Sequence, residues 1–185
     1  MRTTTACTPL LLALLLALLW AAAAAAAEPP VPSPYLAELS GDWELTGTVQ
    51  GKPAHYRAHG ACVLNRSWLE FSMRDVATPP AYEARVYIGY DRGADDYIAH
   101  WLDKFGAAGA RVLGSGHLSG RTLVLNFPYA EGAFRDTLTL ADAGRGTLLI
   151  EAQDKDGRWS TFALYQMKRL STPAPARPAG AAASH

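Results

Sequence analysis

The feature that most constrains this chain is a series of short β-prone segments, each followed by residues that favour a turn. The segments are rich in Val, Ile, Thr, Tyr, Phe and Trp, and they recur about every ten residues. The gaps hold Gly, Pro, Asn or Asp, which favour tight turns. We therefore predict strands at Trp43–Val49, His55–Leu64, Ser67–Asp75, Tyr82–Tyr90, Asp96–Leu102, Arg111–Leu118, Thr122–Phe127, Phe134–Leu140, Gly146–Ala152 and Trp159–Lys168.

Helical periodicity is nearly absent from this region. One helical turn is predicted at Tyr35–Leu39, and no segment supplies the crossover helices that a parallel sheet needs. The strands should therefore form an antiparallel meander. Closing such a sheet into a barrel removes its exposed edges. The prediction is an all-β protein with a single antiparallel β-barrel of about ten strands, wide enough to enclose a cavity; a β-sandwich is the alternative.

The N-terminus has the pattern of a secretory signal peptide over residues 1–27. Arg2 precedes the apolar stretch Leu10–Trp20, and the alanines of Ala21–Ala27 offer a cleavage site near Ala27. The alternative is an uncleaved anchor, for which this stretch is short. We expect a periplasmic or secreted protein without stable membrane insertion after cleavage. The Pro-rich segment 28–34 is predicted as a linker, 35–170 as the barrel domain, and the Pro/Ala-rich segment 171–185 as a disordered tail.

Charge and cysteine content exclude further classes. The 17 Lys and Arg residues balance 17 Asp and Glu residues, so there is no basic surplus for binding nucleic acid. Cys7 would leave with the signal peptide, and Cys62 would then be the only thiol. The mature chain could form no internal disulfide and must be stabilised by its core. We expect Cys62 to be a small buried residue.

Several short motifs together suggest a family. They are Gly41-Asp42-Trp43, Gly89-Tyr90-Asp91, the block from Tyr97 to Asp103, and the closing Tyr165-Gln166-Met167-Lys168-Arg169. In this order they resemble the bacterial domain-of-unknown-function family fifteen-seventy-nine, a calycin-like, lipocalin-related barrel group with a distant likeness to nitrobindin-type barrels. The resemblance implies a fold but no activity and no catalytic residue.

The same residues suggest how the barrel closes. Gly41 would permit a tight entry into the first strand, and Trp43 would plug one end. A cation late in the chain, Arg169 or Lys168, would lie over the indole and tie the last strand to the first. The alternative is that Trp43 binds a ligand.

The candidate lumen residues come from the mixed aromatic and polar faces of the predicted strands. A concave apolar site with a few polar groups is the usual design for binding a small molecule. The alternative places Glu70, Arg74 and Arg85 on the solvent side as cross-strand ion pairs. The candidates for ligand binding are Trp68, Glu70, Arg74, Arg85, Tyr87 and Tyr165.

No motif assigns a metal, a cofactor or a catalytic residue. His55 and His59 would lie about 13 Å apart on a strand, too far for one metal ion. The acidic turn at 91–96 lacks the spacing of a calcium loop. The last predicted strand has no histidine for a haem. The nucleophile elbow is also missing.

Three functions remain open. The first is an exported protein that binds a small apolar or amphipathic molecule in the barrel lumen. The second is a hydrolase or isomerase that uses lumen carboxylates, for which Glu70 and Glu83 are candidates. The third is a cell-envelope interaction module without a small ligand. We predict the first and favour it over an enzyme, with the other two kept as alternatives.

Overall fold

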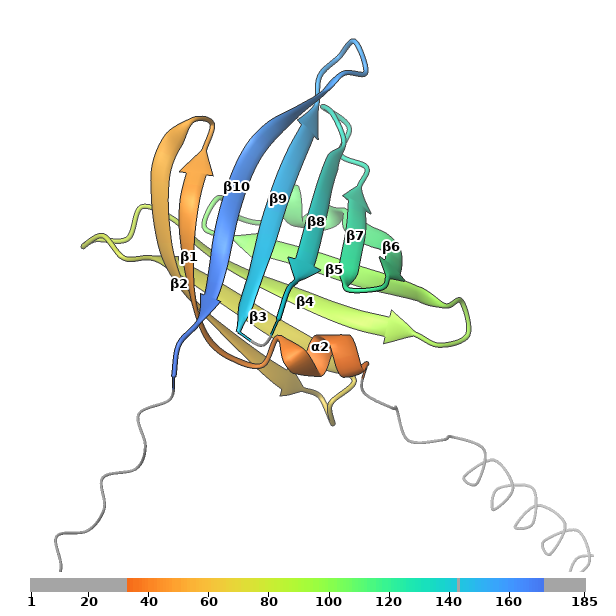
Figure 1. Cartoon of the computed structure of the whole chain (residues 1–185). Coiled ribbons are helices and arrows are strands. Elements are labelled where there is room, and N and C mark those ends of the chain that lie inside the picture. Colours follow the sequence, from red (N-terminus) through yellow and green to blue (C-terminus); the bar gives the residue numbers. More distant parts are fainter. Residues whose placement is uncertain (1–32, 143, 172–185) are drawn as a thin grey trace, which may run out of the picture. The chain divides into compact units, whose positions relative to one another are not determined.

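A computed structural model describes residues 33–142 and 144–171, which form a closed antiparallel β-barrel with one helix at its end (Figure 1). Each strand pairs with the next along the chain, and β10 pairs with β1 to close the sheet. The elements are α2 (Pro34–Glu38), β1 (Gly41–Val49), β2 (Lys52–Val63), β3 (Trp68–Asp75), β4 (Glu83–Asp91), β5 (Asp96–Asp103), the 3-10 turn η1 (Gly109–Arg111), β6 (Leu113–Ser119), β7 (Thr122–Phe127), β8 (Phe134–Leu140), β9 (Arg145–Gln153) and β10 (Trp159–Arg169).

The predicted all-β barrel is confirmed, and the closed strand order excludes the sandwich. The largest boundary error is at β2, which begins at Lys52 rather than His55. The preceding turn has only two central residues, Gln50 and Gly51, both with positive φ (48° and 75°). Such a turn leads directly into the next strand. Pro53 is tolerated because β3 pairs with β2 only from Tyr56 onward, so no strand there needs its missing N–H.

The last strand contains an irregularity that sequence alternation cannot reveal. The pairing of β10 with β9 shifts register between Thr161 and Ala163. Ala163, Tyr165 and Met167 are buried inside the barrel, and Phe162 is partly buried against the same core. A bulge adds one residue and so changes which side chains face inward. This explains why both faces of the segment look apolar in the sequence.

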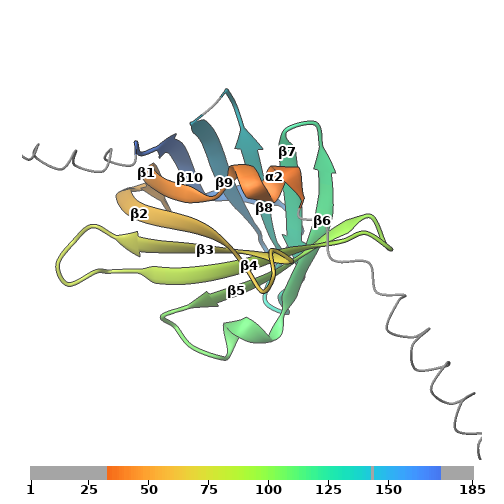
Figure 2. The same ribbon diagram turned by 90° about the horizontal axis from the view of Figure 1, so that it is seen from below.

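The short helix α2 lies across one end of the barrel, as the view along the axis shows (Figure 2). Tyr35 and Leu36 are buried, and Leu39, which follows the helix, is fully buried. The hydroxyl of Tyr35 donates to the carbonyl oxygen of Leu138 in β8 at 2.7 Å. A Cβ on Gly60 of β2 would lie 2.0 Å from the carbonyl oxygen of Leu39. The helix therefore seats closely against the strand ends.

Candidate functional site

The end of the barrel beside α2 is closed by a pair of side chains from the first and last strands. The guanidinium carbon of Arg169 lies 4.3 Å from the centroid of the Trp43 ring. Arg169 also donates hydrogen bonds to the backbone carbonyls of Glu38 and Ser40. The indole N–H of Trp43 donates to the carbonyl oxygen of Leu39 at 2.9 Å. This end is held together by stacking and hydrogen bonds.

Two further residues matter to this closure. Gly41 has φ of +106°, and a Cβ there would lie 2.8 Å from the Arg169 guanidinium. Glycine is needed here both for the backbone conformation and for the space. Lys168, the other cation at the end of the chain's last strand, is exposed and pairs in register with Glu44 and Arg145.

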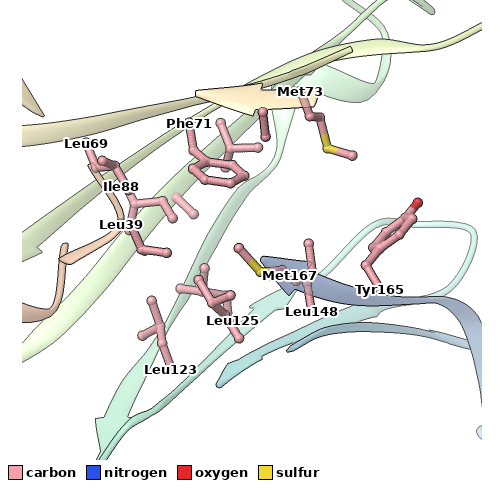
Figure 3. Close-up of a cluster of buried hydrophobic side chains, with 14 of the residues drawn as sticks. Leu39, Leu69, Phe71, Met73, Ile88, Leu123, Leu125, Leu148, Tyr165 and Met167 are labelled. Carbon is pink, nitrogen blue, oxygen red and sulfur yellow. The ribbon is translucent and has the colours of Figure 1, made fainter. Parts of the chain in front are cut away.

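Apolar side chains from opposite walls face one another inside the barrel (Figure 3). One wall contributes Leu69, Phe71 and Met73 from β3, all buried. The facing wall contributes side chains from β7, β9 and β10, among them the hydroxyl-bearing Tyr165 (Figure 3). Nearly all of the side chains that are buried among the described residues are apolar.

One carboxylate breaks this apolar interior. Asp136 of β8 is 5% exposed and is the only charged side chain among the described residues that is buried. It shares its face with Leu138 and Leu140, and its strand neighbours in register are Leu125 and Ile150. Burial raises the pKa of the Asp136 carboxyl from 3.8 to about 7. An acid in these surroundings changes its charge close to neutral pH.

The surroundings of Asp136 indicate that it reaches an open space. It makes no hydrogen bond or ion pair within the described residues. Yet every side-chain oxygen or nitrogen in that part of the chain that is sealed from solvent has a hydrogen-bond partner. The carboxyl oxygens of Asp136 therefore touch space that a water molecule can enter. A buried polar group in such a position is costly unless something binds it.

Aromatic rings surround the end of the barrel away from α2. Edge-to-face contacts join Tyr56 of β2 to Tyr165 (ring centroids 5.5 Å apart) and to Tyr82 (6.1 Å). A second series begins at Trp101, which lies edge-on to Phe127 at 6.4 Å. It continues through Phe127–Tyr129, Tyr129–Phe134 and Phe134–Phe162 contacts.

A hydrogen-bond chain links the two aromatic series. The indole N–H of Trp101 donates to the Tyr82 hydroxyl at 3.0 Å, and this hydroxyl donates to a carboxylate oxygen of Asp103 at 3.2 Å. Tyr82 precedes β4, whereas Trp101 and Asp103 belong to β5. The rings are thus fixed relative to one another. A series of rings with fixed positions can bind an apolar or aromatic ligand with little loss of conformational entropy.

The negative charge of Asp136 contributes to the raised pKa values of two phenols. Burial is the main cause that raises the pKa of the Tyr129 hydroxyl, and the negative charge of Asp136 adds to it. Burial also raises the pKa of the Tyr165 hydroxyl, again with a contribution from Asp136. Both phenols are therefore within electrostatic reach of this carboxyl, and both stay protonated at neutral pH. Asp136, Tyr129 and Tyr165 define what we call the Asp136 site.

The structure places only one of the predicted lumen residues, Tyr165, inside the barrel. Glu70 lies on the outer face, where it accepts a hydrogen bond from Tyr87 at 3.0 Å and forms an ion pair with Arg85 at 3.2 Å. Arg74 is exposed and pairs with Glu83 at 2.8 Å. The cost of burying charge decides the direction of these strands, because their alternate residues are apolar.

Trp68 also lies on the outer face, where its apolar ring suggested the opposite. A Cβ on Gly89 of β4 would lie 3.0 Å from the Trp68 ring, so the indole covers the glycine that is its partner in register. The predicted lining is therefore corrected at Trp68, Glu70, Arg74, Arg85 and Tyr87.

Sequence reasoning missed Asp136, although its segment carries a signal. In the predicted strand Phe134–Leu140, alternate residues put Asp136 on one face with Phe134, Leu138 and Leu140. A single acid on an otherwise apolar face is unusual, since charged residues are rarely buried. The aromatic series was missed for a different reason. Tyr129 lies outside the strands, where alternation predicts nothing, and Tyr82 was predicted as the first residue of a strand but precedes β4.

The outer surface has a groove of about 500 Å³ over β2 to β5. Its charged residues are largely paired with one another, as in the ion pairs Arg74–Glu83 and His59–Asp42 (2.7 Å). Elsewhere, Asp91 caps its own turn by accepting from the backbone N–H of Gly93. Within the described residues, no group of three or more His, Cys, Asp and Glu side chains is arranged to hold a metal ion. The charged groups of the groove largely neutralise one another, so the groove is a weaker candidate for a binding site than the Asp136 site.

Comparisons with known proteins agree with this architecture. The chain is similar to the crystal structure of Rv2717c from M. tuberculosis, with a TM-score of 0.51 and 15% identity, over 76% of this chain and 100% of that one. At this identity the likeness concerns the fold alone. No curated protein matches the sequence. A family model described as a protein of unknown function, DUF1579, matches residues 29–169. This match covers the whole barrel, and the chain therefore belongs to the DUF1579 family.

Proposed function

We propose that this protein binds a small amphipathic molecule inside the barrel, at the end away from α2. The apolar part of the ligand would lie against the aromatic series, and its polar group would meet Asp136. The observation that carries the proposal is the Asp136 carboxyl, which is 5% exposed, has no hydrogen bond to any described residue, and touches space open to water. A polar group that is left without a partner in an apolar interior is typical of a binding site.

The difference between the two ends of the barrel supports this assignment. The end beside α2 is closed by the Arg169–Trp43 stack. The other end has aromatic rings that are only partly buried, including Tyr82, Trp101 and Tyr129. Rings of this kind offer apolar area to a ligand together with a polar tip. A ligand would therefore enter at the aromatic end.

A second candidate is acid–base catalysis at Asp136, in line with the hydrolase or isomerase alternative. It is favoured by the burial of Asp136 in the apolar interior, which raises the pKa of its carboxyl to about 7 and so suits a general base. The carboxylates named in the sequence do not support it, because Glu70 and Glu83 pair with arginines on the outer face. It is tested by screening ester hydrolysis and proton exchange next to a carbonyl. Activity that Asp136→Asn abolishes would establish it, and activity that Asp136→Asn leaves unchanged would contradict it.

We propose further that the protein acts outside the cytoplasm. The support is the signal-peptide pattern of residues 1–27. These residues lie outside the described part of the chain, and the predicted tail after Ser171 does so too. No helix in the part of the chain that the structure describes has the length and apolar composition to cross a membrane.

The first test is a pair of mass spectra of the full chain, produced in a bacterial host with its own N-terminus. The denatured protein reports whether cleavage near Ala27 has occurred. The native spectrum reports any small molecule that stays bound. A reproducible added mass that is lost on denaturation supports ligand binding. A mass that still includes residues 1–27 contradicts the export proposal.

The second test uses N-phenyl-1-naphthylamine, a neutral apolar molecule whose fluorescence rises in apolar surroundings. We expect saturable binding with one molecule per chain. Replacing Tyr129, which is partly buried at the aromatic end, by alanine should weaken binding about five- to tenfold, since one ring contact is lost. The matched control is Tyr87→Ala, which removes a partly buried tyrosine from the outer face. Equal effects of the two substitutions, or no saturable binding, would refute the proposed site.

A further inference from the structure

We propose that the polar group of the ligand is a protonated amine, held between the Asp136 carboxylate and the surrounding aromatic rings. This inference rests on the proposed function and specifies the class of ligand. It names an amphipathic ammonium compound rather than a fatty acid, a fatty alcohol or a neutral hydrocarbon.

The first argument is charge balance in the interior. Asp136 is the only charged side chain buried among the described residues, so no cation of the protein lies beside it there. Its chain neighbour Arg135 points the other way, where it pairs with Glu151 at 2.8 Å and stacks on Trp159. An ionised carboxylate in low dielectric requires a counter-charge. A ligand with a cationic head would supply this counter-charge.

The second argument is the chemistry of the walls. Asp136 adds to the rise in pKa of the Tyr129 and Tyr165 phenols, so both lie within its electrostatic reach. Its strand neighbours in register, Leu125 and Ile150, are apolar. Aromatic faces carry partial negative charge and attract organic cations, whereas they repel anions. Tyr56 lies 5.5 Å from Tyr165, ring to ring, and extends this surface. The aromatic walls and the carboxylate therefore both favour a positively charged ligand.

The third argument excludes the alternatives. A fatty acid would bring its carboxylate against Asp136, and two like charges in an apolar site repel each other strongly. A neutral alcohol would satisfy the hydrogen bond but would leave the carboxylate without a counter-charge. The ammonium group does both, because it donates three hydrogen bonds and carries a positive charge.

The test is competition by three molecules of equal length and different charge. The assay measures how well decylamine, decanol and decanoate each displace N-phenyl-1-naphthylamine from the full-length protein at pH 8. There the amine is protonated and Asp136 is mostly ionised. We expect decylamine to bind at least about tenfold more tightly than decanol, with decanoate the weakest, since a desolvated ion pair is worth more than a neutral hydrogen bond.

Two variants identify the residue responsible. Asp136→Asn keeps the shape of the side chain but removes its charge, and it should bring decylamine and decanol to within about twofold of each other. Asp142→Asn, at an exposed aspartate whose side chain has no hydrogen bond to the residues that the structure describes, should keep the full preference of the wild type.

The possible failures separate the two proposals. If the reporter binds but decylamine and decanol compete equally, the ammonium assignment is wrong and the binding site stands. The same conclusion follows if the preference survives in Asp136→Asn. Titration calorimetry measures the binding of decylamine directly. If neither the reporter nor decylamine binds, the proposed function fails.

Discussion

Arg169 lies over the indole of Trp43, with 4.3 Å between the guanidinium carbon and the ring centroid, and so joins the last strand of the barrel to the first. The contact does more than add a cation–π interaction. The same guanidinium donates to two backbone carbonyls before β1, and the indole donates to a third. One pair of side chains thus ties the helix, β1 and β10 together.

Replacing Arg169 by leucine should therefore destabilise the protein by about 2–4 kcal/mol, since a cation–π contact and hydrogen bonds to two backbone carbonyls are lost together. Urea denaturation measures the effect. The control is Arg158→Leu, at an exposed arginine that pairs with Asp154 and Asp156 in its own turn, which should change stability by less than about 1 kcal/mol. Equal losses in the two variants would contradict a special role for Arg169.

Asp136 should make stability depend on pH. In the unfolded chain its carboxyl ionises near pH 3.8, whereas in the folded protein burial holds the pKa at about 7. The unfolded state therefore releases its proton first, and folding becomes less favourable as pH rises from about 4 to about 7. The total loss is on the order of 4 kcal/mol and stays constant above that range.

Asp136→Asn should remove this contribution. The variant should match the wild type near pH 4 and exceed its free energy of unfolding at pH 8. The difference between the two proteins, measured by urea denaturation across this range, isolates Asp136 from all other titrating groups. Asp142→Asn serves as the control. A wild type that is more stable than Asp136→Asn at pH 8 would show that the carboxylate has a counter-charge in the free protein.

Gly60 lets the segment after α2 approach the sheet. A Cβ there would lie 2.0 Å from the backbone oxygen of Leu39, far inside van der Waals contact. Gly60→Ala should lower the free energy of unfolding by about 2–3 kcal/mol, because the backbone must move to relieve the clash. Gly109→Ala is the control, since nothing lies within 4 Å of that position. A neutral Gly60→Ala would mean that α2 is not seated as described.

Phe127 joins Trp101 to Tyr129 and is 2% exposed. Phe127→Ala should cost about 3–5 kcal/mol, as is usual when a buried ring is removed. Phe105→Ala makes the same chemical change at a side chain that is 77% exposed, and it should cost less than about 1 kcal/mol. Thermal denaturation compares the two, and similar melting temperatures would argue against a packed aromatic series.

Local patterns predicted the strands well because β-strands have a short period and turns have a distinctive chemistry. Thr122–Phe127 and Phe134–Leu140 were predicted with both boundaries correct. At β6 the prediction began at Arg111, but Gly109–Arg111 forms a 3-10 turn and the strand starts at Leu113. Strand ends depend on what the neighbouring strand offers, and β5 pairs with β6 only as far as Leu113.

The direction in which a strand faces was harder to predict than its existence. Trp68, Glu70 and Tyr87 belong to strand faces that mix aromatic and polar residues. Such a face fits either side of the sheet, and these three residues lie outside. In β10 a bulge brings Phe162 towards the core together with Ala163. Alternation gives two sets of residues for each strand, but only the closed sheet decides which set is inside.

The sequence by itself determined the class of the fold, the number of strands and their order, because hydrophobic alternation and turn residues act over short stretches of chain. Only the tertiary structure decided the Asp136 site. Closing the sheet turned one face of every strand inward, which buried Asp136 away from water and brought Tyr129 and Tyr165 within its electrostatic reach. A carboxyl acquires a pKa of about 7 from the low dielectric around it, and that environment is built by residues from strands far apart in the chain.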